Sequence, residues 1–266
     1  MVMNVSPDIN SVLVPRGVSK LRSLHTLGIV DISRGKDILR DISRLTQLRK
    51  LRVDGINKRN YQAFRLAVAD LKCLESLSIR SGEEQGLCGR LNDMYSDSES
   101  VPSLQSLRLY GNLTKLPQWI EKLENLVKLK LRSTRISEVD DAMEVLGKLP
   151  NLGILCMWKE SFVDEEIRFS FHREAFRSLL VLEVAVRGNV KLVKFEEGTA
   201  PKLELLQYRD ERTDAIASFS GLPHLPSLKQ VLINSFYRDV VLKDEFVKDL
   251  QGQLARNPNL PVLKGV

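Results

Sequence analysis

The sequence predicts an α/β solenoid of about nine repeats, with a parallel β-sheet on its concave face and an irregular or short-helical convex side. One observation behind this prediction is a recurring apolar frame, L-x-x-L-x-x-L-x-L in its strongest copies, as in LTQLRKLRV from Leu45 and LENLVKLKL from Leu123. The other is the even spacing of that frame along the chain. Its third apolar position falls at residues 27, 51, 77, 107, 129, 155, 182, 206 and 231.

The intervals between these positions are 22 to 30 residues, which is within the period of leucine-rich repeats. One repeat of this length cannot close a core alone, whereas stacked repeats share one. The final L-x-L of each frame alternates apolar and polar residues, as a short strand with one buried face does. We therefore expect parallel strands in which Leu129 and Leu131 point inward and Lys128, Lys130 and Arg132 point outward.

The segments between the expected strands carry turn signals. Leu123 and Leu126 are three residues apart, a spacing that fits a helical turn or a tight bend. The stretches VPRGV (14–18) and LPQWI (116–120) resemble each other, each with a proline near the start of a turn and an apolar anchor three residues later. Proline is tolerated there because no ladder donor is required.

We expect the solenoid to occupy residues 1–240, with two insertions. Residues 81–100 are acidic and rich in Ser and Gly, which is typical of a mobile loop on the outer or side surface. The aromatic residues of the second insertion, residues 159–175, indicate that it folds back onto the solenoid; they are Phe162, Phe169 and Phe171. Residues 241–266 are expected to form a capping helix and tail, in which Phe246, Leu250 and Leu254 make one apolar stripe.

Composition is typical of a folded, water-soluble protein: 266 residues, 43% hydrophobic, 28% charged and a net charge of +6. No apolar run is long enough for a membrane span, and the first residues do not resemble a secretory signal. Three scattered cysteines predict a reducing compartment rather than a disulfide framework. The first repeat begins without an evident cap, so we expect further sequence before residue 1.

The outward strand positions of repeats two to five are mostly basic. Seven of these twelve positions carry Lys or Arg, and one is acidic. Neighbouring like charges on a parallel sheet repel each other, so solubility explains the cluster poorly. The alternative is an acidic protein surface docked there, with charge steering its approach and register. The candidate residues are Lys50, Arg52, Arg80, Arg108, Tyr110, Lys128, Lys130 and Arg132.

The corresponding positions of the later repeats are more apolar. Seven of these twelve are apolar and one is basic. Trp158 is the largest of them and would supply a desolvated anchor for a partner. The competing interpretation is that the 159–175 insertion covers Trp158. The candidate partner-binding residues in this half are Ile154, Trp158, Val181, Leu205 and Arg209.

Other classes of function have weaker support in the sequence. The histidines His25, His172 and His224 are scattered and lack metal-ligand spacing. No H-E-x-x-H, G-x-S-x-G or G-x-x-x-x-G-K frame is present, so we expect neither catalysis nor nucleotide binding. Tyr110 is the only aromatic residue among the basic outward positions, which provides no stacking platform for nucleic acid.

Three stretches give the chain a family resemblance: VPRGVSKLRSLHTLGIVDI, ISRLTQLRKLRVDGINKRNYQAF and LYGNLTKLPQWIEKLENLVKLKL. Together with GLPHLPSLKQVLI they resemble the leucine-rich-repeat region of plant disease-resistance proteins. These are intracellular nucleotide-binding receptors, and the match is to the coiled-coil class found in cereals. The resemblance covers nearly the whole chain.

The resemblance implies a sensor for pathogen effectors in the cytoplasm, with the nucleus as a second compartment. In that family the repeats dock on the nucleotide-binding module and hold it inactive, and the C-terminal repeats contribute to recognition. The implied partners are an acidic surface of that module, and a pathogen effector or its host target. The coiled coil and phosphate loop are missing here, so ADP or ATP is expected only if a nucleotide-binding module lies upstream. The alternative is a free-standing scaffold or a ubiquitin-ligase substrate receptor, which would need an F-box-like segment that this sequence lacks.

Overall fold

A computed structural model of the chain gives its architecture. The structure describes residues 17–33, 37–81, 87–92, 94–95, 103–186, 190–210, 217–235 and 244–265.

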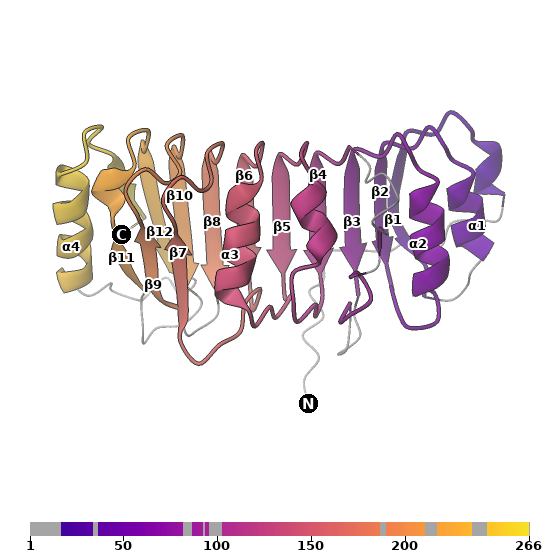
Figure 1. Cartoon of the computed structure of the whole chain (residues 1–266), viewed down its shortest axis with the longest axis horizontal. Helices are drawn as coiled ribbons and strands as arrows, with labels where there is room; N and C mark the ends of the chain where they lie inside the picture. The colour runs from indigo at the N-terminus through magenta and orange to yellow at the C-terminus, as the bar shows by residue number, and fades with distance from the viewer. Residues whose placement is uncertain are drawn as a thin grey trace.

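A ten-stranded parallel sheet runs the length of the molecule (Figure 1). Its strand order follows the chain, with β7, β9 and β11 left out because they belong to a second sheet. Each of the nine positions that the repeat pattern marked falls inside one of its strands, so the predicted solenoid with a parallel sheet is confirmed. The strands are β1 (Thr26–Asp31), β2 (Lys50–Asp54), β3 (Ser76–Arg80), β4 (Ser106–Tyr110), β5 (Lys128–Arg132), β6 (Ile154–Trp158), β8 (Val181–Val186), β10 (Leu205–Asp210), β12 (Gln230–Ser235) and β13 (Val262–Lys264).

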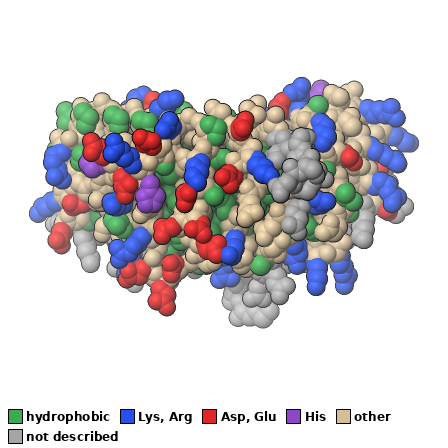
Figure 2. All heavy atoms as spheres, viewed as in Figure 1, with side chains coloured by type: hydrophobic (Ala, Val, Ile, Leu, Met, Phe, Trp, Pro, Cys, Tyr) green, Lys and Arg blue, Asp and Glu red, His purple; other side chains and the backbone are tan. Residues whose placement is uncertain are grey.

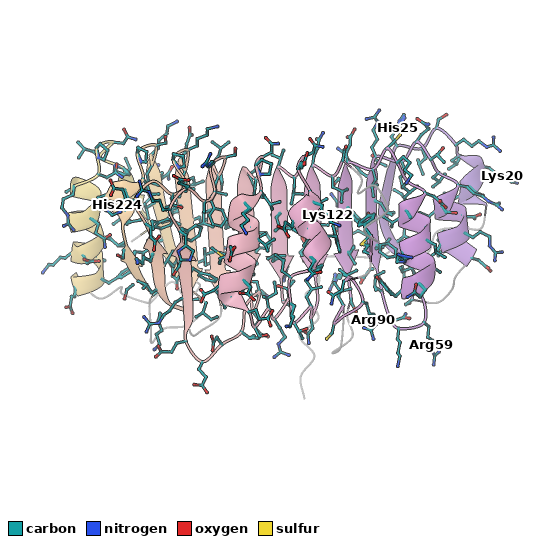
Figure 3. The ribbon with its side chains drawn as sticks, in the orientation of Figure 1. Lys20, His25, Arg59, Arg90, Lys122 and His224 are labelled. Atoms are coloured by element: carbon teal, nitrogen blue, oxygen red, sulfur yellow. The ribbon has the colours of Figure 1, made fainter. Side chains whose placement is uncertain are left out.

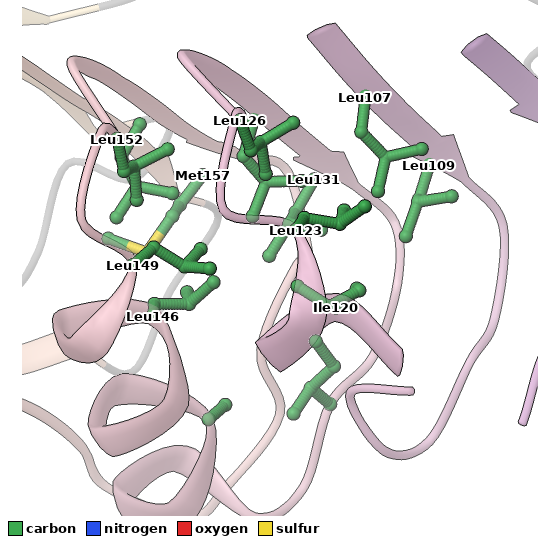
Figure 4. Packing of buried hydrophobic residues seen from close by; sticks show 14 of the residues in the cluster. Leu107, Leu109, Ile120, Leu123, Leu126, Leu131, Leu146, Leu149, Leu152 and Met157 are labelled. Atoms are coloured by element: carbon green, nitrogen blue, oxygen red, sulfur yellow. The ribbon is translucent and has the colours of Figure 1, made fainter. Parts of the chain in front are cut away.

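The strands pair in register, so equivalent positions of successive repeats lie side by side. Leu107 of β4, Leu129 of β5 and Leu155 of β6 are direct neighbours in the ladder. All three are fully buried. In β4 and β5 burial alternates strictly between leucines and outward residues, as the L-x-L pattern predicts. The leucines of the loops before the strands join the same core, which is seen in close-up for three repeats in Figure 4.

Helices cover one face of the sheet in the N-terminal and central repeats (Figure 1). In a leucine-rich-repeat solenoid the face opposite the strands' exposed side is the convex side, and we use that name for the helix-covered face. The opposite face is called the concave face below. The short 3-10 helices η1 and η2 overlap the ends of the two similar stretches, VPRGV (14–18) and LPQWI (116–120). The helical elements of this part are η1 (Val18–Lys20), α1 (Asp37–Ser43), α2 (Tyr61–Ala69), η2 (Gln118–Lys122) and α3 (Val139–Lys148).

The convex side of the C-terminal repeats differs from the expected helical or irregular segments, because it carries a second, three-stranded parallel sheet. Its strands are β7 (Ile167–Phe171), β9 (Val190–Phe195) and β11 (Ser218–Ser220), in the order β11-β9-β7. Aromatic side chains fill the space beneath it. The rings of Phe171 and Phe195 stack with centroids 4.7 Å apart, and both are buried. Alternating aromatic and aliphatic residues favour strands over helices here.

Both expected insertions pack on the solenoid where they are described. Phe162, Phe169 and Phe171 of the second insertion are buried, and its strand β7 lies in the convex sheet. The described part of the first insertion is not a loose loop. Its apolar side chains Leu87, Leu91, Met94 and Tyr95 are buried, and the Trp119 indole N–H donates to the carbonyl oxygen of Leu91 at 2.6 Å. The rest of the expected mobile loop, residues 82–86, 93 and 96–100, lies outside the described residues.

The C-terminal end of the solenoid is covered by α4 (Asp244–Ala255), which contacts β11, β13 and the 3-10 helix η3 (Leu222–His224). Leu250 and Leu254 of the expected apolar stripe are buried, and Phe246 packs partly against the core. The tail after α4 adds β13 to the main sheet, which the sequence did not indicate. The expected boundary at residue 240 lies among residues that the structure does not describe.

Replacing Asn257 with alanine is expected to destabilise this end by about 2 kcal/mol. The Asn257 amide donates to the carbonyl oxygens of Leu222 (2.7 Å) and Leu225 (2.9 Å), and the residue is 1% exposed. Alanine would leave two carbonyl groups buried without these donors. Urea unfolding followed by circular dichroism measures the change.

The matched control is Asn151→Ala, because Asn151 makes a similar bond to the Glu124 carbonyl oxygen (2.8 Å) but is exposed to water. We expect a loss below about 0.5 kcal/mol for it. Equal losses of stability for the two variants would contradict the special importance of the buried Asn257 hydrogen bonds for this end of the solenoid.

The concave face as a candidate protein-binding surface

The outward side chains of the main sheet form three ladders across the concave face. Residues at the same position of successive strands lie opposite each other in the printed register from β2 to β10. The first ladder contains Lys50, Ser76, Ser106, Lys128, Ile154, Val181 and Leu205. The second contains Arg52, Ser78, Arg108, Lys130, Cys156, Glu183 and Gln207. The third contains Arg80, Tyr110, Arg132, Trp158, Ala185 and Arg209.

The basic candidates form two groups on this face. Lys50 and Arg52 of β2 are exposed and are separated from the others by the serines of β3. Arg80 lies 3.9 Å from Asp54, which offsets its charge. The second group, on β4 and β5, is denser and is partly buried. It consists of Arg108, Tyr110, Lys128, Lys130 and Arg132, and we call it the central basic group.

Small residues of the concave face are shielded by their long neighbours. Ser78 and Cys156 are 8% and 2% exposed, although they occupy outward positions of their strands. Their ladder neighbours are Arg108 and Lys130, respectively. Long aliphatic stems such as those of Arg and Lys can cover small neighbouring residues in this way.

Lys130 and Trp158 join the basic half of the face to the apolar half. The ammonium nitrogen of Lys130 lies 4.0 Å from the centroid of the Trp158 ring, which is cation–π geometry. The 159–175 segment, expected as an alternative cover for Trp158, instead leads into β7 of the convex sheet. Lys130 is therefore the side chain that the structure places over this ring.

Two side-chain N–H donors in this region are buried without an acceptor. They are Nε of Arg108 on β4 and Nε1 of Trp158 on β6, one on each side of β5. An unpaired buried donor is unfavourable, so such groups in folded proteins call for a specific explanation. A partner protein that brings a hydrogen-bond acceptor into this region would explain why these two donors are unpaired in the free chain.

The apolar candidates cluster at one edge of the sheet. Ile154, Val181 and Leu205 are consecutive in the first ladder and are partly exposed. Val127 and Leu180, which sequence reasoning missed, extend this cluster because they are 45% and 43% exposed and directly precede β5 and β8. The sequence did contain a sign of this exposure, because each of these apolar residues directly precedes a strand. At the same position other repeats carry polar or charged residues, namely Arg49, Glu75, Gln105, Glu204 and Lys229. Arg209 lies apart from this edge, in the third ladder.

Charge alone does not single out the concave face. Figure 2 shows the convex side, where Lys and Arg side chains also gather at the N-terminal end of the solenoid and acidic ones are more frequent toward the middle and the C-terminal end. What distinguishes the concave face is the combination of aligned cations, unpaired donors and an adjacent apolar edge.

In the described ranges, no group of three or more His, Cys, Asp or Glu side chains has metal-binding geometry. His25 and His224 lie at opposite ends of the solenoid (Figure 3). A cavity of about 690 Å³ lies between β9, β11, η3 and α4 on the convex side, and its charged lining contains both signs, including Lys194, Arg256 and Asp249.

Cys156 is expected to react with a thiol reagent such as Ellman's reagent at pH 8 about tenfold more slowly than Cys88, or slower still. Burial, with a smaller contribution from Glu183, raises the pKa of Cys156 to about 11, whereas Cys88 is exposed. The folded chain holds this proton more tightly than the unfolded chain does. The stability that the Cys156 proton contributes is therefore fully present at neutral pH, and it is lost as the pH rises toward 11. The reaction is quenched at a series of times, and peptide mapping gives the modification rate of each cysteine. Equal rates for Cys156 and Cys88 would show that Cys156 is not protected.

Comparison with known proteins agrees with this architecture. The family described as "Leucine-rich repeat region" matches residues 1–263. The disease resistance protein RPM1 of Arabidopsis thaliana is 24% identical over 262 residues, which cover 96% of this chain and 26% of RPM1. The disease resistance protein Pik-2 of Oryza sativa subsp. japonica is 23% identical over 239 residues, covering 81% of this chain and 23% of Pik-2. This chain thus spans about a quarter of the length of these relatives.

Among solved structures, an internalin (InlF) of Listeria monocytogenes aligns with a TM-score of 0.46 at 15% identity, covering 96% of this chain and 77% of the internalin chain. The fold assignment depends on the sheet and its register rather than on that likeness. In the described part of the chain, no helix is long and apolar enough to span a bilayer. The resemblance to plant disease-resistance proteins is confirmed by these relatives, and the match along nearly the whole chain shows that it belongs to the leucine-rich-repeat family.

Proposed function

We propose that this chain is the non-catalytic protein-interaction region of an intracellular plant immune receptor. In this proposal it contributes to recognition of a pathogen effector, or of the effector's host target, and to autoinhibition of the receptor. The receptor would act in the cytoplasm or the nucleus. Its leucine-rich repeats and its relatives among disease-resistance proteins support an interaction role in defence.

The two halves of the concave face would divide these tasks. The N-terminal half, with Lys50, Arg52 and the central basic group, would bind an acidic surface of a nucleotide-binding module and restrain it. The later repeats, with Ile154, Val181, Leu205, Trp158 and Arg209, would contact the effector or its target. The observation that carries the proposal is the register from β4 to β6, which places cations and apolar groups on one continuous face.

ADP or ATP would bind only to that nucleotide-binding module and not to this chain. The leucine-rich-repeat fold acts by binding other proteins, and nothing in the concave ladders resembles a phosphate cradle. Any ADP or ATP dependence of the receptor would therefore reach this chain through its contact with the module.

The experiment has two steps. The first determines the 5′ end of the transcript and asks whether an in-frame nucleotide-binding module precedes this region. The second produces that module separately and measures its binding to the chain by titration calorimetry. Binding that weakens as salt increases supports the proposal, because charge contacts between exposed groups are screened.

The alternative is a free-standing scaffold or a substrate-receptor-like adaptor of a ubiquitin ligase. Translation that begins at Met1, with no upstream module, would favour it. A module that is present but does not bind the chain would contradict the autoinhibitory role.

A further inference from the structure

We infer that Lys130 is a movable cover over Trp158, and that the two side chains together bind one partner segment in which Asp or Glu lies next to a large apolar residue. This inference deepens the proposed function, on which it rests, by naming the chemistry that the middle of the concave face recognises.

The cover is defined by its position. Lys130 and Trp158 lie on adjacent strands, one ladder apart, and the Lys130 ammonium nitrogen is 4.0 Å from the indole centroid. Among the described residues, no carboxylate forms an ion pair with this ammonium group. Trp158 is partly exposed, so a displaced Lys130 would leave its ring face open to a partner.

The contact is weak enough to be displaced. A cation–π interaction at a partly exposed site shifts an equilibrium by only about two- to fivefold. A charge-assisted hydrogen bond to a carboxylate is stronger than its neutral counterpart and has a defined direction. A carboxylate that approaches the central basic group would therefore draw the Lys130 ammonium away from the ring.

The unpaired donors indicate where the acidic group would lie. Nε of Arg108 and Nε1 of Trp158 are buried without acceptors, on the strands that flank Lys130. The Lys130 ammonium lies over the Trp158 ring, between the strands that carry these donors, so its movement would change the surroundings of both. One carboxylate has two oxygens and can accept several hydrogen bonds, which fits a site that contains two unpaired N–H donors and an ammonium group.

The apolar part of the partner would lie over the indole. The third-ladder neighbour of Trp158 on β8 is Ala185, whose small side chain leaves the indole without a bulky neighbour on that side. The first ladder, with Ile154, Val181 and Leu205, lies at the other end of these strands, on the far side of the second ladder. An apolar side chain next to the acidic one would pack against the indole ring and Ala185, and such central aromatic residues are frequent anchors of interfaces.

Fluorescence of Trp158 tests the cover in the free chain. The protein has two tryptophans, so Trp119→Phe leaves Trp158 as the only one. In that background, Lys130→Ala is expected to raise quenching by acrylamide about twofold, because the ring loses its cover. Lys130→Arg should retain the wild-type value, since Arg also stacks on aromatic faces.

Lys128→Ala is the matched control, because Lys128 lies on the same strand and face but does not cover the ring. Trp119 is itself buried, so the same comparison is made by fluorine NMR of 5-fluorotryptophan in the chain that keeps both tryptophans. Equal exposure of Trp158 with and without the Lys130 side chain, in both measurements, would overturn the cover.

Short peptides test the chemistry of the partner. The probe is acetyl-Asp-Leu-Asp-Leu-amide, and its controls replace Asp by Asn or Leu by Ser. At millimolar concentration we expect only the probe to shift Trp158 fluorescence, and Lys130→Ala to weaken the response severalfold. An equal response to either control, or no response to the probe, would overturn the assigned chemistry.

These results separate the inference from the proposed function. One outcome is that replacing Lys128, Lys130 and Arg132 of β5 with glutamate weakens docking of the nucleotide-binding module, while Trp158 responds to none of the tests above. In that case only the cover is wrong. If Trp158 responds as expected and the module does not bind, only the autoinhibitory role is wrong.

Discussion

Replacing Leu131 with alanine is expected to lower the free energy of unfolding by about 3 to 5 kcal/mol. Leu131 is fully buried in β5, where its ladder neighbours are Leu109 of β4 and Met157 of β6. Figure 4 shows it within the stack formed by the leucines of three successive repeats. Alanine would remove three side-chain carbons, one methine and two methyl groups, and leave a cavity lined by neighbours on both sides.

The size of the loss follows from the solenoid architecture. Each repeat contacts only the repeats beside it, so damage to a central repeat weakens two interfaces. Leu27 of β1 lies in an edge strand of the described sheet, with β2 as its single partner there. We therefore expect Leu27→Ala to cost roughly half as much as Leu131→Ala.

Urea unfolding followed by circular dichroism and by tryptophan fluorescence measures both variants. Non-coincident transitions would show that part of the solenoid unfolds separately, in which case each transition is fitted by itself. Lys128→Ala, on the same strand but on the concave face, should change stability by no more than about 0.5 kcal/mol. A loss below about 1 kcal/mol for Leu131→Ala would contradict the shared core.

The main sheet could be predicted from sequence because one local pattern repeats. Every strand must bury alternate residues against the same core, so this alternation marks its position even in weak copies such as PKLELLQY, where Leu206 and Tyr208 are the buried pair. Register then follows without further information, because repeats of nearly equal length bring equivalent positions together. This is why the outward positions of β4 and β5 were assigned correctly to one face.

The convex sheet could not be predicted in the same way. The stretch IRFSF alternates in polarity and VKLVKF does so only in part, and nothing local says that they pair with each other across a repeat. The short strand β13 is harder still, because three residues carry little pattern and the strand pairs with β12 only after α4 has turned the chain back. Pairing between non-adjacent segments is a tertiary property.

The sequence predicted which of the candidate residues share one face of the sheet, but not their contacts. The sequence indicated that Lys130 and Trp158 share a face, yet the approach of the ammonium group to the ring depends on side-chain conformation. It likewise gave no sign that Arg108 and Trp158 contain unpaired donors. Such features depend on which neighbours fill the remaining space, and this is decided by three-dimensional packing.

Reversing the charges of β5 is expected to weaken binding of the nucleotide-binding module by about a hundredfold at low salt. The variant is Lys128→Glu, Lys130→Glu and Arg132→Glu. These side chains lie on one strand beside Arg108, so their reversal turns the middle of the central basic group acidic. Long-range attraction acts mainly on the association rate, so the loss should appear there, and it should shrink as salt screens the charges. Surface plasmon resonance at several salt concentrations measures both effects.

A second triple variant separates the position of the charges from their number. Lys58→Glu, Arg59→Glu and Lys72→Glu changes the net charge by the same amount at exposed positions outside the concave strands. Circular dichroism confirms that each variant folds before binding is compared. If docking depends on the concave face, the control should lose only the weak, salt-sensitive part of the attraction that acts at a distance. Equal losses for the two variants would show that the module responds to the overall charge of the N-terminal repeats, and the concave face would then not be its docking surface.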